Sequence, residues 1–424
     1  MEEKNSKFFK YFMTVLITAV ITCMATTFIL SQICTPKIEI KKSNNIAWKI
    51  AGNILNSFSG VTNNGEDISL NDKLYEIKSD LDKLYVGEYD EQKLIDGALE
   101  GYVAGVGDQY TEYLNEEEIK SLQEDVNGSY VGVGLYIAQN TQTNQILVIG
   151  VIEDSPGHKA GILAGDVIKK IDGVEYTGDQ LTQASNKMKG VAGSKVVITV
   201  ERDGEEKEIE AIREEIKFKT VKSEELENNI GYIKISSFGG ETADDFKKAY
   251  EELQSKSIKS LIIDLRQNGG GLVDQSLSIA EMIVPKGSTM LITTDKNKNE
   301  EVSKSNKEPI INVPIVILVD EYTASASEIL TAAVKENTNT KVIGTKTYGK
   351  GVIQGIYLLK DKKTGLKITI QEYFTPNHNK LNKVGITPDE IVELPDEWKG
   401  HTSVDKNEDT QLKRAIECAI GDAS

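Results

Sequence analysis

The chain has 424 residues, of which 39% are hydrophobic and 27% charged, as is usual for a soluble globular protein. This length allows two or three domains and a large core. The formal net charge of -17 argues against nucleic acid as a partner, because phosphate binding needs a basic surface. The 3 cysteines and 3 histidines form neither a disulfide framework nor a metal-ligand pattern, so no metal or other cofactor is expected.

The N-terminal segment 11–36 is uncharged, largely apolar and long enough to span a bilayer. Three lysines precede it and no small-residue cleavage site follows, which favours an uncleaved signal anchor over a buried core helix. Lysines also follow the span, so charge bias alone does not settle the orientation. We expect residues 1–36 to form a tail and a transmembrane anchor in the cytoplasmic membrane, with the rest of the chain on the extracytoplasmic side.

The next three segments differ in their hydrophobic pattern. A polar linker is expected at 37–71, and residues 72–126 have apolar residues at the three- and four-residue spacing of helices. From 127 to 213 the pattern changes to short β-rich runs between glycine-rich turns, which predicts one compact module. The expected elements of this module are strands at 132–137, 145–151, 167–171 and 195–202 and a helix at 180–188.

From 214 to 395 strands and helices alternate, which indicates an α/β domain. The fold class is therefore α/β (α+β) and multidomain. Residues 396–424 form a tail with an amphipathic helix at 409–420, and the charged stretch 294–308 is expected to be a loop or hairpin. The expected strands of the α/β domain are 231–236, 261–265, 315–319, 341–344 and 366–373, and its expected helices are 242–255, 275–284 and 325–336.

Ser325 follows a continuous apolar run, Pro314–Val319, and a short turn, and it begins a predicted helix with small residues in its first turn. This order places a hydroxyl at the carboxyl edge of a sheet, where the free N–H groups of the helix favour a developing negative charge. Ser325 is thus a candidate nucleophile. Serine is also a common N-cap, and Ser327 competes for either role.

Lys350 lies between two glycines, and Gln354 follows four residues later. A neutral lysine can activate a serine, and burial can lower the lysine pKa from about 10.4 by up to ~3–5 units. If this segment is a strand, the even separation puts Lys350 and Gln354 on one face, where Gln354 could orient the amine. The alternative for Lys350 is the usual fate of lysine, a solvated loop position.

A glycine turn, Gly269–Gly271, follows the predicted strand at 261–265. Glycines let backbone N–H groups approach a ligand closely, so the turn is a candidate oxyanion hole. Taken alone, it could equally be a tight loop or a phosphate cradle. It lacks the Gly-Lys-Ser/Thr ending of a nucleotide-binding loop.

Together these segments resemble the carboxyl-terminal processing proteases, or tail-specific proteases, from about residue 70 to 395. Ser325-Ala-Ser-Glu328 resembles the nucleophile motif of that family, Gly349-Lys-Gly351 its base motif, and Gln354 its third catalytic position. Asp264–Leu272 resembles the family segment Asp-Leu-Arg-x-Asn-Pro-Gly-Gly, with Gly269 in place of the proline. The resemblance implies a crotonase/ClpP-like core. It also implies catalysis by Ser325, Lys350 and Gln354, and an oxyanion hole formed by Gly270 or Gly271 with Ala326.

The β-rich module at 127–213 resembles a PDZ domain, because Tyr130–Leu135 is similar to the carboxylate-binding loop and Ser155–Ile162 to a second signature. Consecutive N–H groups in a glycine-rich turn can bind a terminal carboxylate while the peptide adds to the adjacent strand. The substrate C-terminus is thus expected at Val133, Gly134 and Leu135. The alternative is a β-rich module that only packs on the protease.

The sequence therefore predicts a membrane-tethered serine endopeptidase that acts on proteins or peptides with apolar C-termini. Helices within 72–125 and 409–420 are candidate homodimer elements. One alternative is a PDZ-containing peptide-binding scaffold without turnover. The other is a crotonase-like acyl-transfer enzyme, which would not explain the PDZ-like module. The histidines, His158, His378 and His401, are expected at the surface.

Overall fold

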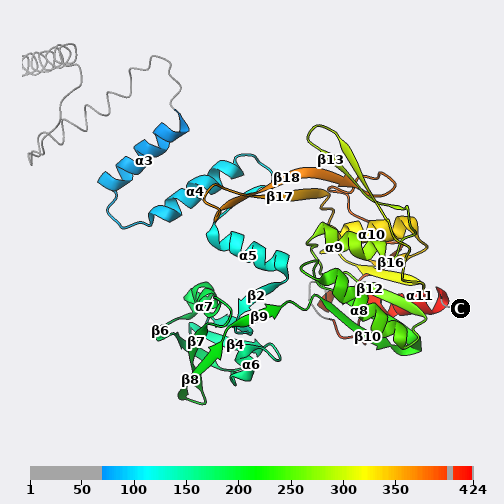
Figure 1. Cartoon of the computed structure of the whole chain (residues 1–424), viewed down its shortest axis with the longest axis horizontal. Coiled ribbons are helices and arrows are strands. Elements are labelled where there is room, and N and C mark those ends of the chain that lie inside the picture. Colours follow the sequence, from blue (N-terminus) through cyan, green and yellow to red (C-terminus); the bar gives the residue numbers. More distant parts are fainter. Residues whose placement is uncertain (1–68, 399–403, 423–424) are drawn as a thin grey trace, which may run out of the picture. The chain divides into compact units, whose positions relative to one another are not determined.

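The computed structural model describes residues 69–398 and 404–422 (Figure 1). The predicted anchor at 11–36, most of the predicted linker and His401 lie outside these residues. Within the described ranges, every helix is too short or too polar to traverse a bilayer. The chain divides into two compact units, residues 1–89 and 90–424. The described part of the first unit holds one helix, α3 (Leu70–Leu84), which starts with a capping box between Ser69 and Asp72.

The second unit begins with two helices separated by a short strand that the sequence did not predict. The helices are α4 (Glu91–Ala104) and α5 (Glu116–Asn127), and the strand between them is β1 (Glu112–Leu114). β1 pairs antiparallel with β18 (Gly365–Phe374), about 250 residues later. Three residues are too few to show the two-residue period of a strand. The pairing makes the segment before the β-rich module part of a sheet of the α/β domain.

The β-rich module has its own sheet, in the order β3-β4-β5-β7-β8 with β6 on β5, and its own buried core. The predicted strands at 145–151, 167–171 and 195–202 are confirmed. The predicted run at 132–137 is divided between β2, which pairs with β9, and β3. Its elements are β2 (Ser129–Gly132), β3 (Leu135–Asn140), β4 (Gln145–Val151), α6 (Pro156–Lys159), β5 (Val167–Ile171), β6 (Val174–Glu175), η1 (Gly178–Gln180), α7 (Leu181–Met188), β7 (Lys195–Arg202), β8 (Glu205–Ile212) and β9 (Glu214–Lys217).

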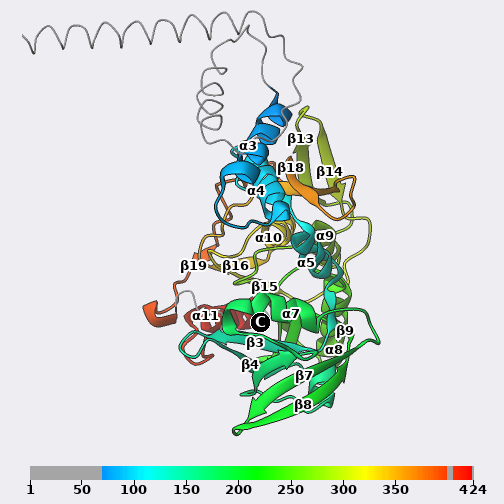
Figure 2. The ribbon, with the colours of Figure 1, turned by 90° about the vertical axis from the view of Figure 1, so that its left-hand side faces the viewer.

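The main sheet of the core has the order β10-β11-β12-β15-β16-β19, with all strands parallel except β10. Helices cover both of its faces (Figures 1 and 2). Its elements are β10 (Val221–Leu226), η2 (Glu227–Asn229), β11 (Ile230–Ile235), α8 (Thr242–Ser255), β12 (Ser260–Asp264), α9 (Val273–Glu281), β15 (Ile315–Val319), α10 (Ala326–Asn337), β16 (Lys341–Gly344), β19 (Glu390–Ile391), η3 (Asp396–Trp398) and α11 (Thr410–Asp422).

Alternate residues of the central strands enter two different cores. On β15, Ile317 packs in the cluster that includes α8, α9 and α10, whereas Val316 packs in the cluster that includes α11. Because both faces are covered, these strands appear in the sequence as continuous apolar runs. The apolar side chains of α11, including Leu412 and Ala415, are buried in this second cluster. That face of the predicted dimer helix is therefore used within the chain.

A second sheet has the order β1-β18-β13-β14, with β17 also on β18. The charged stretch predicted as a loop or hairpin is the hairpin of β13 and β14, and β17 was not predicted as a definite strand. The additional strands are β13 (Thr289–Asp295), β14 (Glu300–Lys304) and β17 (Val352–Leu358).

A buried ionic cluster ties the C-terminal segment to the main sheet. The guanidinium of Arg266, just after β12, binds the carboxylate of Asp264 at 2.7 Å and that of Asp409 at 2.9 Å. Tyr232 and Gln411 add hydrogen bonds to the same cluster. The strands therefore hold the start of α11 through charge as well as through apolar packing.

We expect Arg266→Met to lower the free energy of unfolding by about 3–5 kcal/mol, because it leaves two buried carboxylates without their cation. Urea unfolding measures the change. The control is Arg414→Met, which removes a more exposed guanidinium paired with Glu390 and Glu417 and should cost less than about 1 kcal/mol. Equal costs for the two variants would contradict this interpretation of the buried cluster.

Candidate active site

Ser325 precedes the first residue of α10 and has an unusual backbone conformation, with φ 55° and ψ -118°. Ser325 is the N-cap residue of α10, and its backbone N–H donates to Glu328 Oε2 at 2.9 Å, so the capping position and the candidate nucleophile coincide. A non-glycine residue held in such a conformation is typical of functional sites, where surrounding contacts stabilise the strain. Here Ser325 is half-buried, and its side chain lies within hydrogen-bonding reach of the Tyr373 hydroxyl.

Ser327, the competing serine, has a structural role. Its side chain is fully buried and its hydroxyl donates to the carbonyl oxygen of Asn268 at 2.9 Å. The same carbonyl accepts the N–H of Ala324. Ser327 thus fastens the start of α10 to the glycine turn that follows β12, and Ser325 is the serine available as a nucleophile.

Glu328 joins the serine turn to the lysine loop. One carboxylate oxygen, Oε2, accepts the N–H groups of Ser325 and Lys350, each at 2.9 Å. The other, Oε1, accepts the N–H of Gly349 at 2.8 Å and the hydroxyl of Thr347. Burial raises the pKa of Glu328, and these hydrogen bonds oppose the shift. Sequence reasoning gave Glu328 no role beyond the motif, although its spacing from Ser325 is that of a capping box.

Lys350 shares a cavity of about 510 Å³ with Ser325 and Gln354. Burial lowers the pKa of Lys350, and repulsion by Lys367 adds to this, while Glu112 and Glu328 oppose it. This direction favours the neutral amine that a general base needs. Among the described residues, no hydrogen bond joins the side chains of Ser325 and Lys350. They are neighbours in one cavity without a direct bond.

Two further features hold the lysine loop in place. A Cβ on Gly351 would lie 2.2 Å from the backbone nitrogen of Asn382, so glycine is required there. The hydroxyl of buried Tyr373 donates to the carbonyl of Lys350 and lies 3.2 Å from the carbonyl oxygen of Ser325. Close packing against Asn382, and not only conformational freedom, therefore explains why Gly351 stands next to Lys350.

Gln354 lies in the same cavity as Lys350, but the predicted geometric reason was wrong. Lys350 precedes β17, and the pairing of β17 with β18 shifts register between Ile353 and Gln354. A shared strand face therefore does not relate the two residues. The amide Nε2 of Gln354 donates to Thr369 Oγ1 at 3.3 Å.

The glycine turn distinguishes between the two predicted oxyanion donors. The N–H of Gly270 is donated to Asn268 Oδ1 at 2.9 Å, whereas no hydrogen bond to a described residue uses the N–H of Gly271 or Ala326. A Cβ on Gly270 would lie 2.9 Å from the nitrogen of Ala326. Gly270 therefore keeps this space open, and the free donors are Gly271 and Ala326.

The predicted carboxylate loop of the β-rich module lies between β2 and β3. The carbonyl of Val133 accepts the N–H of Gly157 at 2.7 Å, and that of Gly134 accepts the N–H of Ile152 at 2.9 Å. Gly134 has φ 79°, and a Cβ there would lie 2.3 Å from Ser155. Leu135 begins β3. The loop is thus held by its carbonyl groups and by the N–H of Gly134, which bonds to the Tyr130 hydroxyl, whereas no hydrogen bond to another described residue uses the N–H of Val133.

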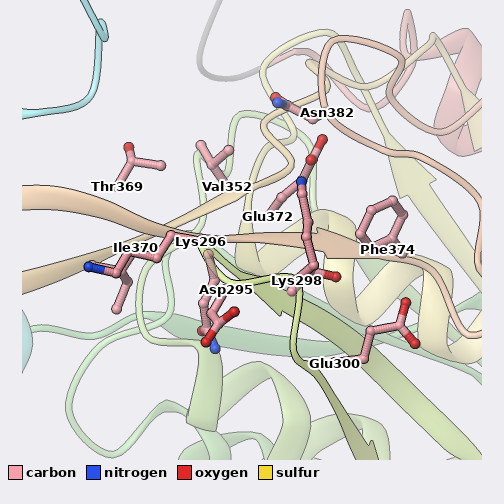
Figure 3. A pocket seen from close by; sticks show the side chains of 12 residues that line it. Asp295, Lys296, Lys298, Glu300, Val352, Thr369, Ile370, Glu372, Phe374 and Asn382 are labelled. Carbon is pink, nitrogen blue, oxygen red and sulfur yellow. The ribbon is translucent and has the colours of Figure 1, made fainter. Parts of the chain in front are cut away.

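A second hollow, of about 500 Å³, lies along β13 and β18 and contains several charged side chains (Figure 3). Most of its acids already have partners. Asp295 accepts N–H groups of its own turn, Glu300 binds His378 at 2.8 Å, and Glu372 lies 3.4 Å from Lys380. This hollow contains neither Ser325 nor Lys350.

His378, like His158, is exposed as predicted.

The model of peptidase family S41 matches residues 229–392, and that of a PDZ domain matches residues 147–202. The chain is 34% identical over 388 residues to the carboxy-terminal processing protease CtpA of Bacillus subtilis, a match that covers 91% of this chain and 78% of that protein. The chain belongs to peptidase family S41. It is therefore a serine-type peptidase of the carboxy-terminal processing group, with a mixed α/β core and a PDZ domain, which sets the acyl-transfer alternative aside.

One further curated relative agrees with this membership, and one solved structure is also similar to the chain. A carboxy-terminal-processing protease of Bartonella bacilliformis is 35% identical over 328 residues, covering 75% of this chain and 74% of that one. The solved structure of a photosystem II D1 C-terminal processing protease is 27% identical, with a TM-score of 0.45, and the match covers 76% of this chain and 88% of that one.

The pH dependence of cleavage should change when a charged residue near Lys350 is replaced. A base acts when neutral, so activity should rise as pH increases through the lowered pKa of Lys350 and be lost below it. Lys367→Met removes a repulsive charge and leaves Glu112 unpaired. The acidic limb of kcat/KM should therefore move to higher pH by roughly 0.5–1 unit. Lys363→Met, which removes an exposed partner of Glu116, should leave the limb in place, and a shift to lower pH for Lys367→Met would contradict the assignment.

Proposed function

We propose that this peptidase cleaves through an acyl-enzyme formed on Ser325, with Lys350 as general base and Gln354 as its orienting partner. The observation that carries this proposal is one cavity that contains a strained serine and a lysine whose pKa burial lowers. The two backbones are also linked, because Glu328 binds the N–H of both residues. A crotonase/ClpP-like core is part of this proposal.

The chemistry follows from these positions. Neutral Lys350 takes the proton of Ser325 as the serine oxygen attacks the scissile carbonyl carbon. The resulting oxyanion accepts the N–H groups of Gly271 and Ala326. When the intermediate collapses, the peptide C–N bond breaks and the lysine ammonium gives its proton to the leaving amine. Lys350 then deprotonates a water that attacks the ester, which releases the acid and restores Ser325.

We expect Ser325→Ala and Lys350→Ala each to lower cleavage of a loosely folded protein by at least about 10³-fold. Ser327→Ala is the matched control, because it removes a buried hydroxyl two residues away without touching the nucleophile, and it should remain active. Undiminished cleavage by either of the first two variants would contradict the proposed serine–lysine mechanism. If wild-type protein shows no turnover and a serine-reactive probe does not label Ser325, the peptide-binding scaffold becomes the better description.

The PDZ domain is proposed to bind the C-terminus of a protein or peptide substrate and so to control access to Ser325. Contacts at the end of α7 support this coupling. Lys189 pairs with Glu124 of α5 and lies 5.4 Å from the ring centroid of Tyr130. Tyr130 stacks on Phe218 at 5.7 Å, and Phe218 lines the cavity of Ser325. A peptide that displaced Lys189 or Tyr130 would therefore act on residues at the cavity.

Amidation of an apolar substrate C-terminus should lower kcat/KM by about 10-fold or more, because the loop at Val133–Leu135 then loses a carboxylate to bind. Matched free-acid and amidated peptides with the same cleavage site measure the effect. Glu124→Gln should reduce the difference between the two peptides if Lys189 transmits binding. Equal rates for both peptides on wild-type enzyme would show that the domain does not sense the C-terminus.

The segment 11–36 carries a separate proposal, a single-pass anchor in the cytoplasmic membrane with the catalytic domain on the extracytoplasmic side. Its length and lack of charge support the span. Membrane fractionation with protease treatment of intact cells tests it, and recovery of full-length enzyme in the cytosol would refute it. A homodimer is likewise a proposal, which gel filtration of the protein without residues 1–36 decides.

A further inference from the structure

The loop between α4 and β1 contacts Lys350 directly and reaches Gln354 through Thr369, although it comes from the segment before the PDZ domain. We propose that residues 108–111 complete the active site: Asp108 orients Gln354 through Thr369, and Tyr110 holds the amine of Lys350. This inference rests on the proposed serine–lysine mechanism. It assigns positioning roles to residues that lie more than 200 positions before the serine in the sequence.

The first contact is a hydrogen-bonded chain centred on Asp108. Its Oδ2 accepts the hydroxyl protons of Thr111 and Thr369, each at 2.6 Å. The N–H of Thr369 also donates to Thr111 Oγ1 at 3.1 Å, which continues the pairing of β1 with β18. Burial opposes ionisation of Asp108, but these hydroxyl groups and the N–H of Tyr110 lower its pKa. At neutral pH Asp108 is therefore an anion that only accepts hydrogen bonds.

This charge determines which end of the Gln354 amide faces the lysine. The hydroxyl of Thr369 has a single proton and gives it to Asp108. The Thr369 oxygen can then only accept a hydrogen bond from Gln354, and it accepts one from the amide Nε2 at 3.3 Å. The amide oxygen Oε1 is left as an acceptor for the ammonium that forms when Lys350 takes a proton. Without Asp108, the Thr369 hydroxyl could donate to the amide instead, and the reversed amide would present N–H groups to a cation.

The second contact is between Tyr110 and Lys350. The amine Nζ of Lys350 lies 4.9 Å from the ring centroid of Tyr110. A cation near an aromatic ring is stabilised by the negative face of the ring, so the contact favours the protonated lysine. The charged groups that act on Lys350 from other elements are Lys367 and Glu112 of the second sheet and Glu328 of α10. Tyr110 contributes a neutral surface that both shields the amine and stabilises the charge formed during proton transfer.

The experiment measures how fast a fluorophosphonate probe labels Ser325, because labelling reports nucleophile activation without a peptide substrate. Thr369→Val should slow labelling by about 3- to 10-fold through loss of one hydrogen bond. In a Gln354→Ala background it should cause no further loss, as expected for residues that act through one another. Thr369→Ser keeps the hydroxyl and should retain most of the rate.

Thr364→Val is the matched control, because it removes a similar threonine–aspartate bond, to Asp361 Oδ2 at 2.7 Å, from the same hairpin. It should not change labelling. Equal slowing by Thr364→Val and Thr369→Val, or full additivity of Thr369→Val with Gln354→Ala, would overturn the role of Asp108 and Thr369. If wild-type Ser325 is not labelled at all, the proposed mechanism fails instead.

The pH profile of labelling tests Tyr110. Tyr110→Leu keeps an apolar neighbour but removes the ring, so the protonated lysine loses stabilisation and its pKa falls. The acidic limb of the labelling rate should then move to lower pH by roughly 0.5–1 unit, with a lower plateau. Tyr110→Phe keeps the ring and should keep the limb. An unchanged limb in Tyr110→Leu would remove Tyr110 from the site.

Discussion

The geometry of this active site depends on one buried carboxylate. Glu328 receives N–H groups from both the serine turn and the lysine loop, which come from different strands of the main sheet. Three of its four donors are backbone N–H groups, and the fourth is the hydroxyl of Thr347, so the contact determines where the two main chains lie. Burial makes an unpaired charge here costly, which is why four donors surround it.

The strain at Ser325 is understandable from this arrangement. A residue with φ 55° needs surrounding contacts that hold it, and Glu328 on one side and Tyr373 on the other provide them. The same packing explains the glycine turn. Gly270 is needed for space beside Ala326, while its own N–H is tied to Asn268, so the neighbouring amide of Gly271 is the one left free.

The proposed catalytic residues belong to a site that three parts of the chain build together. The main sheet supplies Ser325 and the glycine turn, the second sheet carries Gln354, and the segment before the PDZ domain reaches the site through β1 and its preceding loop. The PDZ domain is connected to the same region by the pairing of β2 with β9 and by contacts of Lys189 and Tyr130. A change at any of these contacts can alter the distance between serine and lysine, which are not hydrogen-bonded to each other.

The sequence by itself determined most of the parallel strands and their helices, and it singled out Ser325, Lys350 and Gln354 as candidates, because apolar runs, turn residues and motifs are local signals. It did not determine why Lys350 and Gln354 lie together, since Lys350 precedes β17 and the strand register shifts before Gln354. The choice between Gly270 and Gly271 was left open, and without the resemblance Ser327 competed with Ser325. The tertiary structure separates the members of each pair, because Asn268 bonds the N–H of Gly270 and the hydroxyl of Ser327. The roles of Glu328, Asp108 and Tyr110 likewise arise from contacts between residues far apart in the chain, which no local pattern records.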